Sequence, residues 1–365
     1  MRENNLIPDW ISSPGDTILD VLEERGWTQA DLAERMGYSR KHINLLIKGA
    51  AGITEEAALK LERVLGSTAG FWLNREAQYR EALARQAELE DLKPSTSWLS
   101  ELPITDMVKF GWIQHYSRKV HMVAACLQFF GVATVDAWRE RYAILGVAFR
   151  ASPAFEKKNG AVSAWVRYGE MKAETRTIAP FRRDSLVSLI PAVRSLTCEP
   201  DPTIFIPKLE ECLATVGVAV VVAQAPRGCP VSGLTKWLGP DRALVMLSFR
   251  FKTNDHFWFS LFHELGHLLL HGKKLLFLEG CKEGLQPEQE AEADRWASTI
   301  LIPSSEKPSL QKMDSSSTTI LDFAQRLGIA PGIVLGRLQH DELIPWSSLN
   351  ELKVHYRWVE EEKEP

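Results

Sequence analysis

The stretch FWFSLFHELGHLLLH, residues 257–271, places two histidines four residues apart around a glutamate, in otherwise apolar or small surroundings. A helix turns about 100° per residue, so His263 and His267 lie one above the other on a single face. Two neutral imidazoles there can hold one Zn2+, and Glu264 can act as general base on the water that zinc activates. The spacing predicts a helix with a zinc-dependent hydrolytic site.

The HELGH pattern alone also fits a buried helix that happens to contain histidines. A zinc site is therefore predicted only if the sequence supplies a third ligand. Downstream, EQEAEADRWASTILIP (288–303) places Glu290 and Asp294 four apart on one helical face. Glu290 can complete the zinc site, and Asp294 can accept a hydrogen bond that fixes the tautomer of a ligating histidine. Glu292 projects about 200° away from Glu290. The sequence leaves open which glutamate turns inward.

Two further side chains are ligands by type. His271 lies one turn beyond His267, but zincins that use a third histidine continue as HxxGxxH, and this chain reads HLLLH. We therefore expect His271 to support the site rather than to bind the ion. Cys281 is a soft ligand by type alone.

HELGHLLLH followed by EAEADRWASTILIP resembles the ImmA/IrrE family of zinc metallopeptidases, over residues 215–303. The resemblance implies a gluzincin-like peptidase domain with a zincin-like small sheet beside the metal helix. The family usually has EAN where this chain has EAD, and Asp294 can make the same hydrogen bond. Many members cleave DNA-binding repressors of the Xre type, so a peptide or a repressor is the implied substrate.

The hydrophobic pattern differs before and after the predicted zinc-binding helix at residues 257–271. Before it, VAVVVAQ, VSGLTKWL and ALVMLSFRF are rich in β-branched residues and separated by Pro/Gly turns, so they predict strands. VSGLTKWL (231–238) would be the edge that pairs with an extended substrate. After it, residues 318–346 predict a helix pair with little positive charge, which we expect to pack or dimerise rather than to read DNA.

The N-terminal part predicts a helix-turn-helix. PGDTILDVLEERG (14–26) is a one-faced helix closed by glycine, and WTQADLAERMGYSRKHINLLIKG (27–49) has a glycine turn at Gly37 between two capped helices. Arg and Lys suit guanine edges or phosphates, and Asn suits adenine. The candidate DNA-binding residues are Thr28, Gln29, Ser39, Arg40, Lys41, His42 and Asn44.

ITEEAALKLERVLGSTAGFWLN, residues 53–74, follows the second of these helices. With its surroundings, from about residue 10 to 90, it resembles the HigA family of antitoxins, a branch of the Xre-type repressors. The resemblance implies a five-helix DNA-binding domain that is usually dimeric, represses its own operon and neutralises a toxin. The implied partners are double-stranded operator DNA, a second copy of the chain and a HigB-like toxin.

At 365 residues the chain is long enough for several domains. We predict an α+β protein with a helix-turn-helix domain at 1–90, a linker at 91–105 where the composition turns to Pro, Ser and Thr, and a helical region at 106–215. A zinc metallopeptidase-like core at 216–303 and a C-terminal helical extension at 304–365 complete it.

The composition is that of a soluble globular protein. A formal net charge of -4 argues against a chain coated with nucleic acid, but it leaves room for a local basic face. Five scattered cysteines favour reduced thiols. The N-terminus lacks the apolar core of a signal peptide, and no stretch approaches the roughly 20 apolar residues that span a bilayer. We expect a cytoplasmic protein without a membrane partner.

The two resemblances together predict a fused regulator. An antitoxin-type repressor would be joined to a zinc peptidase that cleaves itself, within residues 85–105, or a repressor partner. The alternative is a non-proteolytic antitoxin or sensor whose C-terminal domain binds a toxin, a metal or a ligand.

Overall fold

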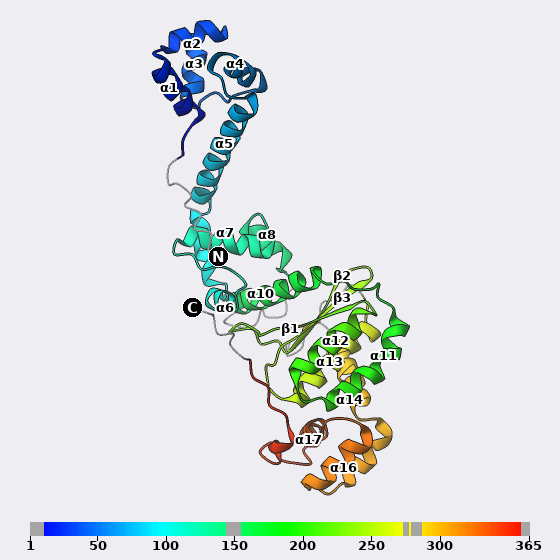
Figure 1. The fold of residues 1–365 in the computed structure, drawn as a ribbon. Coiled ribbons are helices and arrows are strands. Elements are labelled where there is room, and N and C mark those ends of the chain that lie inside the picture. Colours follow the sequence, from blue (N-terminus) through cyan, green and yellow to red (C-terminus); the bar gives the residue numbers. More distant parts are fainter. Residues whose placement is uncertain (1–10, 144–154, 273–276, 279–286, 359–365) are drawn as a thin grey trace. The chain divides into compact units, whose positions relative to one another are not determined.

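The computed structural model describes residues 11–143, 155–272, 277–278 and 287–358. It divides into two compact units, which are described separately below: Met1–Thr96 with Arg118–Ala124, and Ser97–Ser117 with Ala125–Pro365. Helices predominate and one small sheet lies in the second unit (Figure 1). The predicted α+β class, with an N-terminal five-helix domain, is confirmed.

The first unit is built from five helices around one apolar core. Its buried side chains come from all five helices and include Ile18, Leu32, Ile43, Leu61 and Trp72. The helices are α1 (Pro14–Arg25), α2 (Gln29–Met36), α3 (Arg40–Ile47), α4 (Glu55–Leu65) and α5 (Ala69–Asp91).

Neighbouring residues set the ends of these helices. Each begins at a Ser or Thr whose hydroxyl accepts a hydrogen bond from a backbone amide of the first turn, which satisfies one amide that lacks a helical partner. Gly26 (φ 64°) and Gly37 (φ 67°) end α1 and α2 in the left-handed conformation that glycine adopts without strain. The five caps are Ser13, Thr28, Ser39, Thr54 and Thr68.

The predicted linker, 91–105, is helical. α5 runs to Asp91, a 3-10 segment follows at Lys93–Ser100, and α6 (Ile104–Lys109) begins within the range. Trp98 is buried there and packs edge-on against Trp138, with ring centroids 5.2 Å apart. The stretch is therefore ordered, and the boundary between the two units, Thr96/Ser97, falls within it.

The second unit holds the sheet and the remaining helices. The sheet order is β1-β3-β2-β4, with β1 parallel to β3 and the other pairs antiparallel. The strands are β1 (Val218–Val222), β2 (Gly233–Gly239), β3 (Arg242–Leu247) and β4 (Phe277–Leu278). The helices after α6 are α7 (Lys119–Phe130), of which the first unit includes the first half, α8 (Val135–Arg141), α10 (Phe155–Glu174), α11 (Arg183–Ser195), α12 (Pro202–Ala214), α13 (Asn254–Leu270), α14 (Pro287–Leu301), α15 (Lys307–Lys312), α16 (Ser317–Leu327) and α17 (Pro331–His340).

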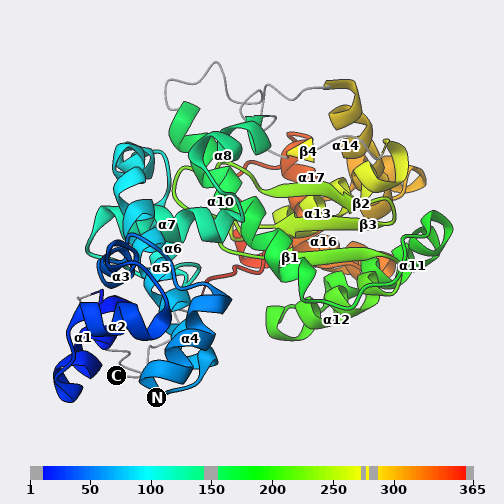
Figure 2. The same cartoon turned by 90° about the horizontal axis from the view of Figure 1, so that it is seen from above.

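Helices cover both faces of the sheet (Figure 2). On one face α10 lies so close to β3 that a Cβ on Gly169 would be 2.1 Å from the Met246 sulfur. On the other, α12 and α13 share a core with Val245 and Leu247, the strand neighbours of Met246. Successive strand residues point to opposite faces, so burial on both sides explains the continuous apolar runs in these strands.

The position of β2 corrects one expectation. We expected residues 231–238 to form an edge that pairs with substrate. Instead β2 lies between β3 and β4, and Leu234 and Thr235 pair with Leu278 and Phe277. At those two residues, β4 already occupies the hydrogen-bonding edge of β2.

One hydrophobic core runs through most of the second unit. It extends in sequence from Leu186 in α11 to Tyr356, and includes residues of α12, β1, β3, α13, α14, α16 and α17. The predicted boundaries at 215/216 and 303/304 therefore cut through a single core. Local hydrophobic patterns do not show which helices share a core, because that depends on contacts between distant residues.

The C-terminal helix pair packs against α13. On α17, a Cβ added to Gly332 would lie 2.4 Å from Asn254 Oδ1, and one on Gly336 would lie 2.5 Å from Asp255 Oδ2. Beyond α17 the chain returns to the start of α13, where Asn254 N donates to Val354 O at 3.0 Å and the buried Lys353 ammonium lies 2.6 Å from Asp255. α17 is thus a packing element, with its glycine face buried.

The segment Lys119–Arg141 is long and apolar enough to cross a membrane by length and composition, which the sequence analysis overlooked. In the structure it forms two helices, α7 with 12 residues and α8 with 7. Gly131 (φ 65°) follows α7, and Thr134 caps α8. Each helix is shorter than the roughly 20 residues that span a bilayer.

Candidate functional site

α13 and α14 bring a set of metal-ligand atoms together. The two histidine Nε2 atoms lie 2.9 Å apart, and Glu290 places one oxygen 3.2 Å from His263 Nε2 and the other 3.4 Å from His267 Nε2. Three ligand atoms from His263, His267 and Glu290 lie within 4.8 Å of one another. These are the three residues that sequence spacing predicted as ligands.

The donor set fits a zinc ion. Ligand atoms held at roughly 2.1 Å by one tetrahedral zinc lie about 3.4 Å from one another, close to the separations seen here. Burial, helped by the neighbouring rings of His263 and His271, lowers the pKa of His267 to about 2. That ring is therefore neutral at physiological pH, with a lone pair free to bind a metal.

Asp294 lies behind the first histidine. Its Oδ1 is 2.8 Å from His263 Nδ1. A ring that binds a metal through Nε2 carries its proton on Nδ1, so in that state His263 donates to Asp294. The departure from the family's EAN pattern therefore supplies an acceptor at this position.

His271 and Glu292 lie behind the second histidine. His267 Nδ1 is 2.9 Å from His271 Nδ1, and His271 Nε2 is 3.3 Å from Glu292 Oε2. If His267 binds through Nε2, its Nδ1–H donates to His271, which in turn donates Nε2–H to Glu292. Glu290 thus faces the Nε2 atoms of His263 and His267, whereas Glu292 contacts His271. Cys281 lies outside the described residues.

Glu264 is fully buried and held from β2. The hydroxyl of Thr235 lies 2.5 Å from Glu264 Oε2 and 3.0 Å from its backbone oxygen. A hydrogen bond to a carboxylate oxygen restricts its rotation. Nothing near residue 235 in the sequence indicates this contact, because the two residues are 29 positions apart.

Small residues let the two ligand-bearing helices pack closely. A Cβ on Gly266 would lie 3.2 Å from the Trp296 ring and 3.4 Å from the Ala293 Cα. Ala293 and Ala297 are fully buried in the same contact. This close packing allows the short side chain of Glu290 to reach the histidines of α13.

Two arginines of α11 hold the C-terminal ends of the same helices. Arg183 Nε donates to Leu269 O, near the end of α13, at 3.1 Å. Arg194 donates to Ile300 O and Leu301 O at the end of α14, at 2.8 and 2.9 Å, and to Leu327 O of α16 at 2.8 Å. These carbonyls have no partner within their own helices. α11 therefore positions both metal-ligand helices, a role we had not assigned to this region.

In the first unit, α3 presents a polar face. Ser39, Arg40 and Lys41 are exposed, and His42 and Asn44 are half-buried, while Ile43, Leu46 and Ile47 face the core. Ser39 and the exposed Thr28 use their hydroxyls as helix caps, and Gln29 is half-buried at the start of α2.

Sequence reasoning missed one neighbour of this face. The ammonium of Lys60 in α4 lies 4.1 Å from the ring centre of Tyr38, in the turn between α2 and α3. Tyr38 packs edge-on against His42 at 4.6 Å. The Lys60 ammonium also lies 2.9 Å from Glu56 Oε1, so its charge near Tyr38 is paired.

Two family models match the chain. Residues 18–72 match the helix-turn-helix model, and residues 233–339 match the model of the IrrE N-terminal-like domain, a peptidase family. The second match covers both metal-ligand helices and continues through α16 and most of α17. The chain thus combines a helix-turn-helix domain with an IrrE N-terminal-like domain.

Curated relatives match the N-terminal part. "Antitoxin HigA-1" of Vibrio cholerae is 43% identical over 56 residues, which are 15% of this chain and 52% of that protein. "Uncharacterized HTH-type transcriptional regulator YddM" of Escherichia coli is 36% identical over 61 residues, which are 17% of this chain and 65% of that protein. The chain thus covers about half to two thirds of each relative.

Proposed function

We propose that the chain is a DNA-binding transcriptional regulator of the antitoxin type whose second unit is a zinc-dependent metallopeptidase acting on a repressor or another protein. The convergence of His263, His267 and Glu290 beside Glu264 is the observation that carries the proposal. The match to a peptidase family over the same helices supports it.

The proposed chemistry divides among few residues. Zinc, when bound by the two histidines and Glu290, would polarise the peptide carbonyl and make water acidic enough to lose a proton near neutral pH. Glu264 would take that proton as general base and deliver it to the leaving amine. Thr235 would keep the carboxylate of Glu264 oriented, and Asp294 would keep His263 in the binding tautomer.

A partner protein is favoured over the chain itself as the substrate. Peptidases of this kind bind substrate as an extended strand. Within residues 85–105, the region proposed for self-cleavage, the chain forms the end of α5, a 3-10 segment and the start of α6. Cleavage there would require these helical turns to unfold first.

The DNA-binding half of the proposal rests on α3. Its exposed Arg40 and Lys41 would contact the major groove or the phosphates of an operator, with Asn44 close by on the same helix. Such a function would place the protein in the cytoplasm, with a homodimer matching a two-fold operator.

A second candidate is an antitoxin or sensor that binds metal without cutting. The likeness to Antitoxin HigA-1 favours it for the first unit, and there a HigB-like toxin would be the partner. The burial of the metal centre favours it for the second, since Glu264 and both histidines are at most 1% exposed.

Glu264→Gln tests the peptidase proposal and separates the two candidates. We expect the parent to hold one zinc per chain and to degrade a repressor partner in cells, whereas Glu264→Gln should keep the zinc and lose cleavage by 100-fold or more. Glu211→Gln, on the exposed side of α12, is the matched control. A parent without stoichiometric zinc would refute the metal centre. Equal responses from parent and Glu264→Gln would favour the sensor.

Fluorescence anisotropy titrations with DNA from the promoter upstream of the reading frame test the proposed DNA binding. Arg40→Ala should weaken binding and reduce the slope of log affinity against log salt by about one, if Arg40 contacts a phosphate. Lys208→Ala, exposed on α12, is the control. Unchanged binding by Arg40→Ala and Lys41→Ala together would refute the assigned DNA face.

A further inference from the structure

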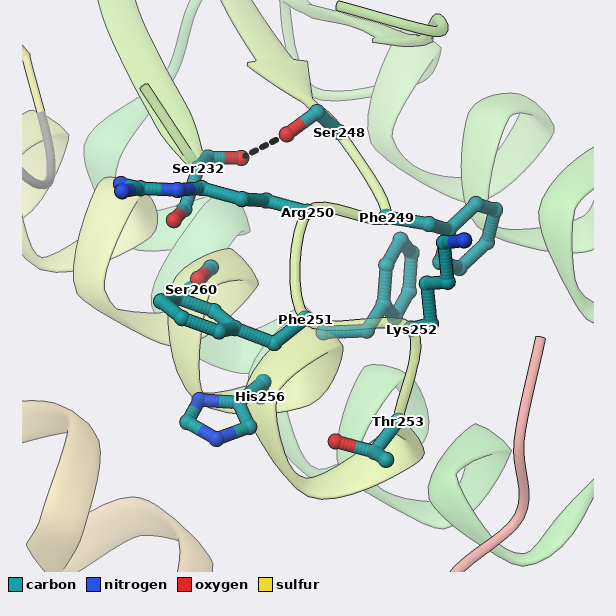
Figure 3. A pocket seen from close by; sticks show the side chains of 10 residues that line it. Ser232, Ser248, Phe249, Arg250, Phe251, Lys252, Thr253, His256 and Ser260 are labelled. Carbon is teal, nitrogen blue, oxygen red and sulfur yellow. Dashed lines mark hydrogen bonds between the residues drawn. The ribbon is translucent and has the colours of Figure 1, made fainter. Parts of the chain in front are cut away.

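We infer that a small pocket at the start of α13 is a binding site for an oxyanion, either a carboxylate or a phosphate. It is formed by the turn after β3, the residue before β2 and the first two turns of α13 (Figure 3). The lining residues that carry the inference are Ser232, Arg250, Lys252, Thr253, His256 and Ser260.

An unpartnered buried hydroxyl points into this pocket. Thr253 is the N-cap of α13, a position where Thr usually accepts a hydrogen bond from a helix amide. Here its side chain makes no such bond, and within the described part of the chain its Oγ1 has no hydrogen-bond partner although the residue is only 8% exposed. Figure 3 shows the hydroxyl directed toward His256. A buried donor of this kind costs free energy unless a ligand or water satisfies it.

The charges around the pocket favour an anion. Arg250 and Lys252 are both exposed at the rim, and the positive end of the 17-residue helix α13 lies beneath. Among the described residues that line the pocket, none is Asp or Glu. Asp255, in the same helical turn, lies 2.6 Å from the buried Lys353 instead, so its charge is compensated there.

Further hydrogen-bond donors surround the same space. Ser232 and Ser260 are nearly buried and both line it. His256 stacks on Phe251 with ring centroids 4.4 Å apart, and burial lowers its pKa, so it offers a neutral N–H. Arg250 donates to Pro230 O and keeps other N–H groups available. The pocket is small and open to solvent, too small for a cofactor, and an oxyanion would lie at its mouth.

A strained turn shapes the rim. Lys252 has φ 59°, in the left-handed region that a non-glycine residue adopts only at an energetic cost. Two hydrogen bonds hold it there, from Lys252 N to Phe249 O at 3.1 Å and from Tyr356 N to Lys252 O at 2.7 Å. The turn leaves Phe251 half exposed beside His256. Strain maintained at a rim of this kind is typical of binding sites.

Two sources could supply the oxyanion. Ser260 precedes Glu264 by one helical turn, about 6 Å along α13, so an acidic side chain of a protein bound near the metal centre is one source. A free anion is the other. The inference does not require peptidase activity, because the pocket is defined by its own residues.

Binding of inorganic phosphate to the zinc-free full chain tests the site. Calorimetry at constant ionic strength should show saturable binding by the parent, weakened at least five-fold by Thr253→Val and by Arg250→Gln. Thr253→Val keeps the side-chain shape and removes the hydroxyl, while Arg250→Gln changes an exposed position that should not affect folding. Lys208→Gln is the control for general loss of positive charge, and it should bind as the parent does.

Competition with two blocked tetrapeptides, identical except that one contains Glu and the other Gln, identifies the source of the oxyanion. Displacement of phosphate by the Glu peptide alone would assign the site to an acidic protein side chain. Phosphate binding that neither peptide displaces would assign it to a free anion. Absence of binding by both phosphate and the Glu peptide, or parent-like affinity in both pocket variants, would overturn the inference. Zinc-free protein keeps these outcomes independent of the proposed peptidase.

Discussion

The helices of the first unit and α13 of the second begin in different ways. In the first unit each helix is capped by the residue just before it, as with Thr28 and Asp31, which hydrogen-bond to each other across one turn. In the second unit the cap residue of α13 makes no cap hydrogen bond, and arginines far along the chain satisfy the other ends of α13 and α14.

The difference matches what each region must present. The helix-turn-helix exposes Arg40 and Lys41 on helices that neighbouring residues cap, whereas a long-range cap from Arg25 to Val64 O and Leu65 O holds the end of α4. The candidate metal centre instead buries Glu264 and two histidines, which must be held from several directions. Local caps define a surface motif, and long-range contacts define a buried centre.

Replacing each of the two candidate glutamates, Glu290 and Glu292, by glutamine should give the largest effect, which is on zinc affinity. Glu290→Gln removes a charged ligand and should weaken zinc binding at least 100-fold, or about 2.7 kcal/mol. Glu292→Gln weakens only the support of His271, and about ten-fold is expected. Competition with a chromophoric chelator measures both. A larger loss in Glu292→Gln would reverse the assignment.

Removing a long-range cap should come next. Arg194→Met leaves three helix-end carbonyls without their donor and should lower the free energy of unfolding of the second unit by about 2–3 kcal/mol. Because it frees the end of α14, zinc affinity should fall as well. Urea unfolding followed by tryptophan fluorescence measures the first effect. Arg295→Met, exposed on α14, should change neither quantity, and equal behaviour of the two variants would contradict the capping role.

A buried carboxylate should make the second unit sensitive to acid. Burial alone would raise the pKa of Glu170, but Lys236, Arg141 and Arg167 outweigh it and lower the pKa below 4.5. The unfolded chain therefore takes up this proton first, so the stabilisation is complete above pH 4.5 and is lost as the pH falls through the lower folded value.

Glu170→Gln tests that dependence. It should cost about 1–2 kcal/mol at pH 7, because the remaining cations are partly exposed, and less at pH 4. Thermal unfolding at both pH values measures the difference, with the exposed Glu211→Gln as control. A cost that does not depend on pH would show that the carboxylate is not charged in the folded protein.

The smallest expected effect is on stability and comes from replacing two threonines at the N-cap position, Thr28 of α2 and Thr253 of α13. Thr28→Val removes a working cap and should destabilise the first unit by about 1 kcal/mol. Thr253→Val removes a hydroxyl without a partner in the described chain, so the free energy of unfolding should stay the same or rise. Urea unfolding of each variant measures both. A similar loss from both substitutions would remove the distinction between the two regions.

Features that depend on local sequence could be predicted, whereas contacts between distant residues could not. Helix period and residue spacing were enough to select His263, His267 and Asp294 and to favour Glu290, because residues four apart on a helix are a local pattern, but spacing left Glu290 and Glu292 open. They were also enough for the capped helices of the first unit. The contact of Thr235 with Glu264, and the arginines of α11, join residues 29 to 133 positions apart, and no short window of sequence encodes such contacts.

The return of the C-terminal segment to the start of α13 has a consequence for the order of events during synthesis. Val354 contacts Asn254 across 100 residues. At roughly 5–20 residues per second, a ribosome adds these residues about 5–20 s after the metal helix is made. The helix-turn-helix, with contacts confined to its own short unit, can fold well within that interval. A newly made chain would therefore be able to occupy DNA before its metal helix has received all of its contacts.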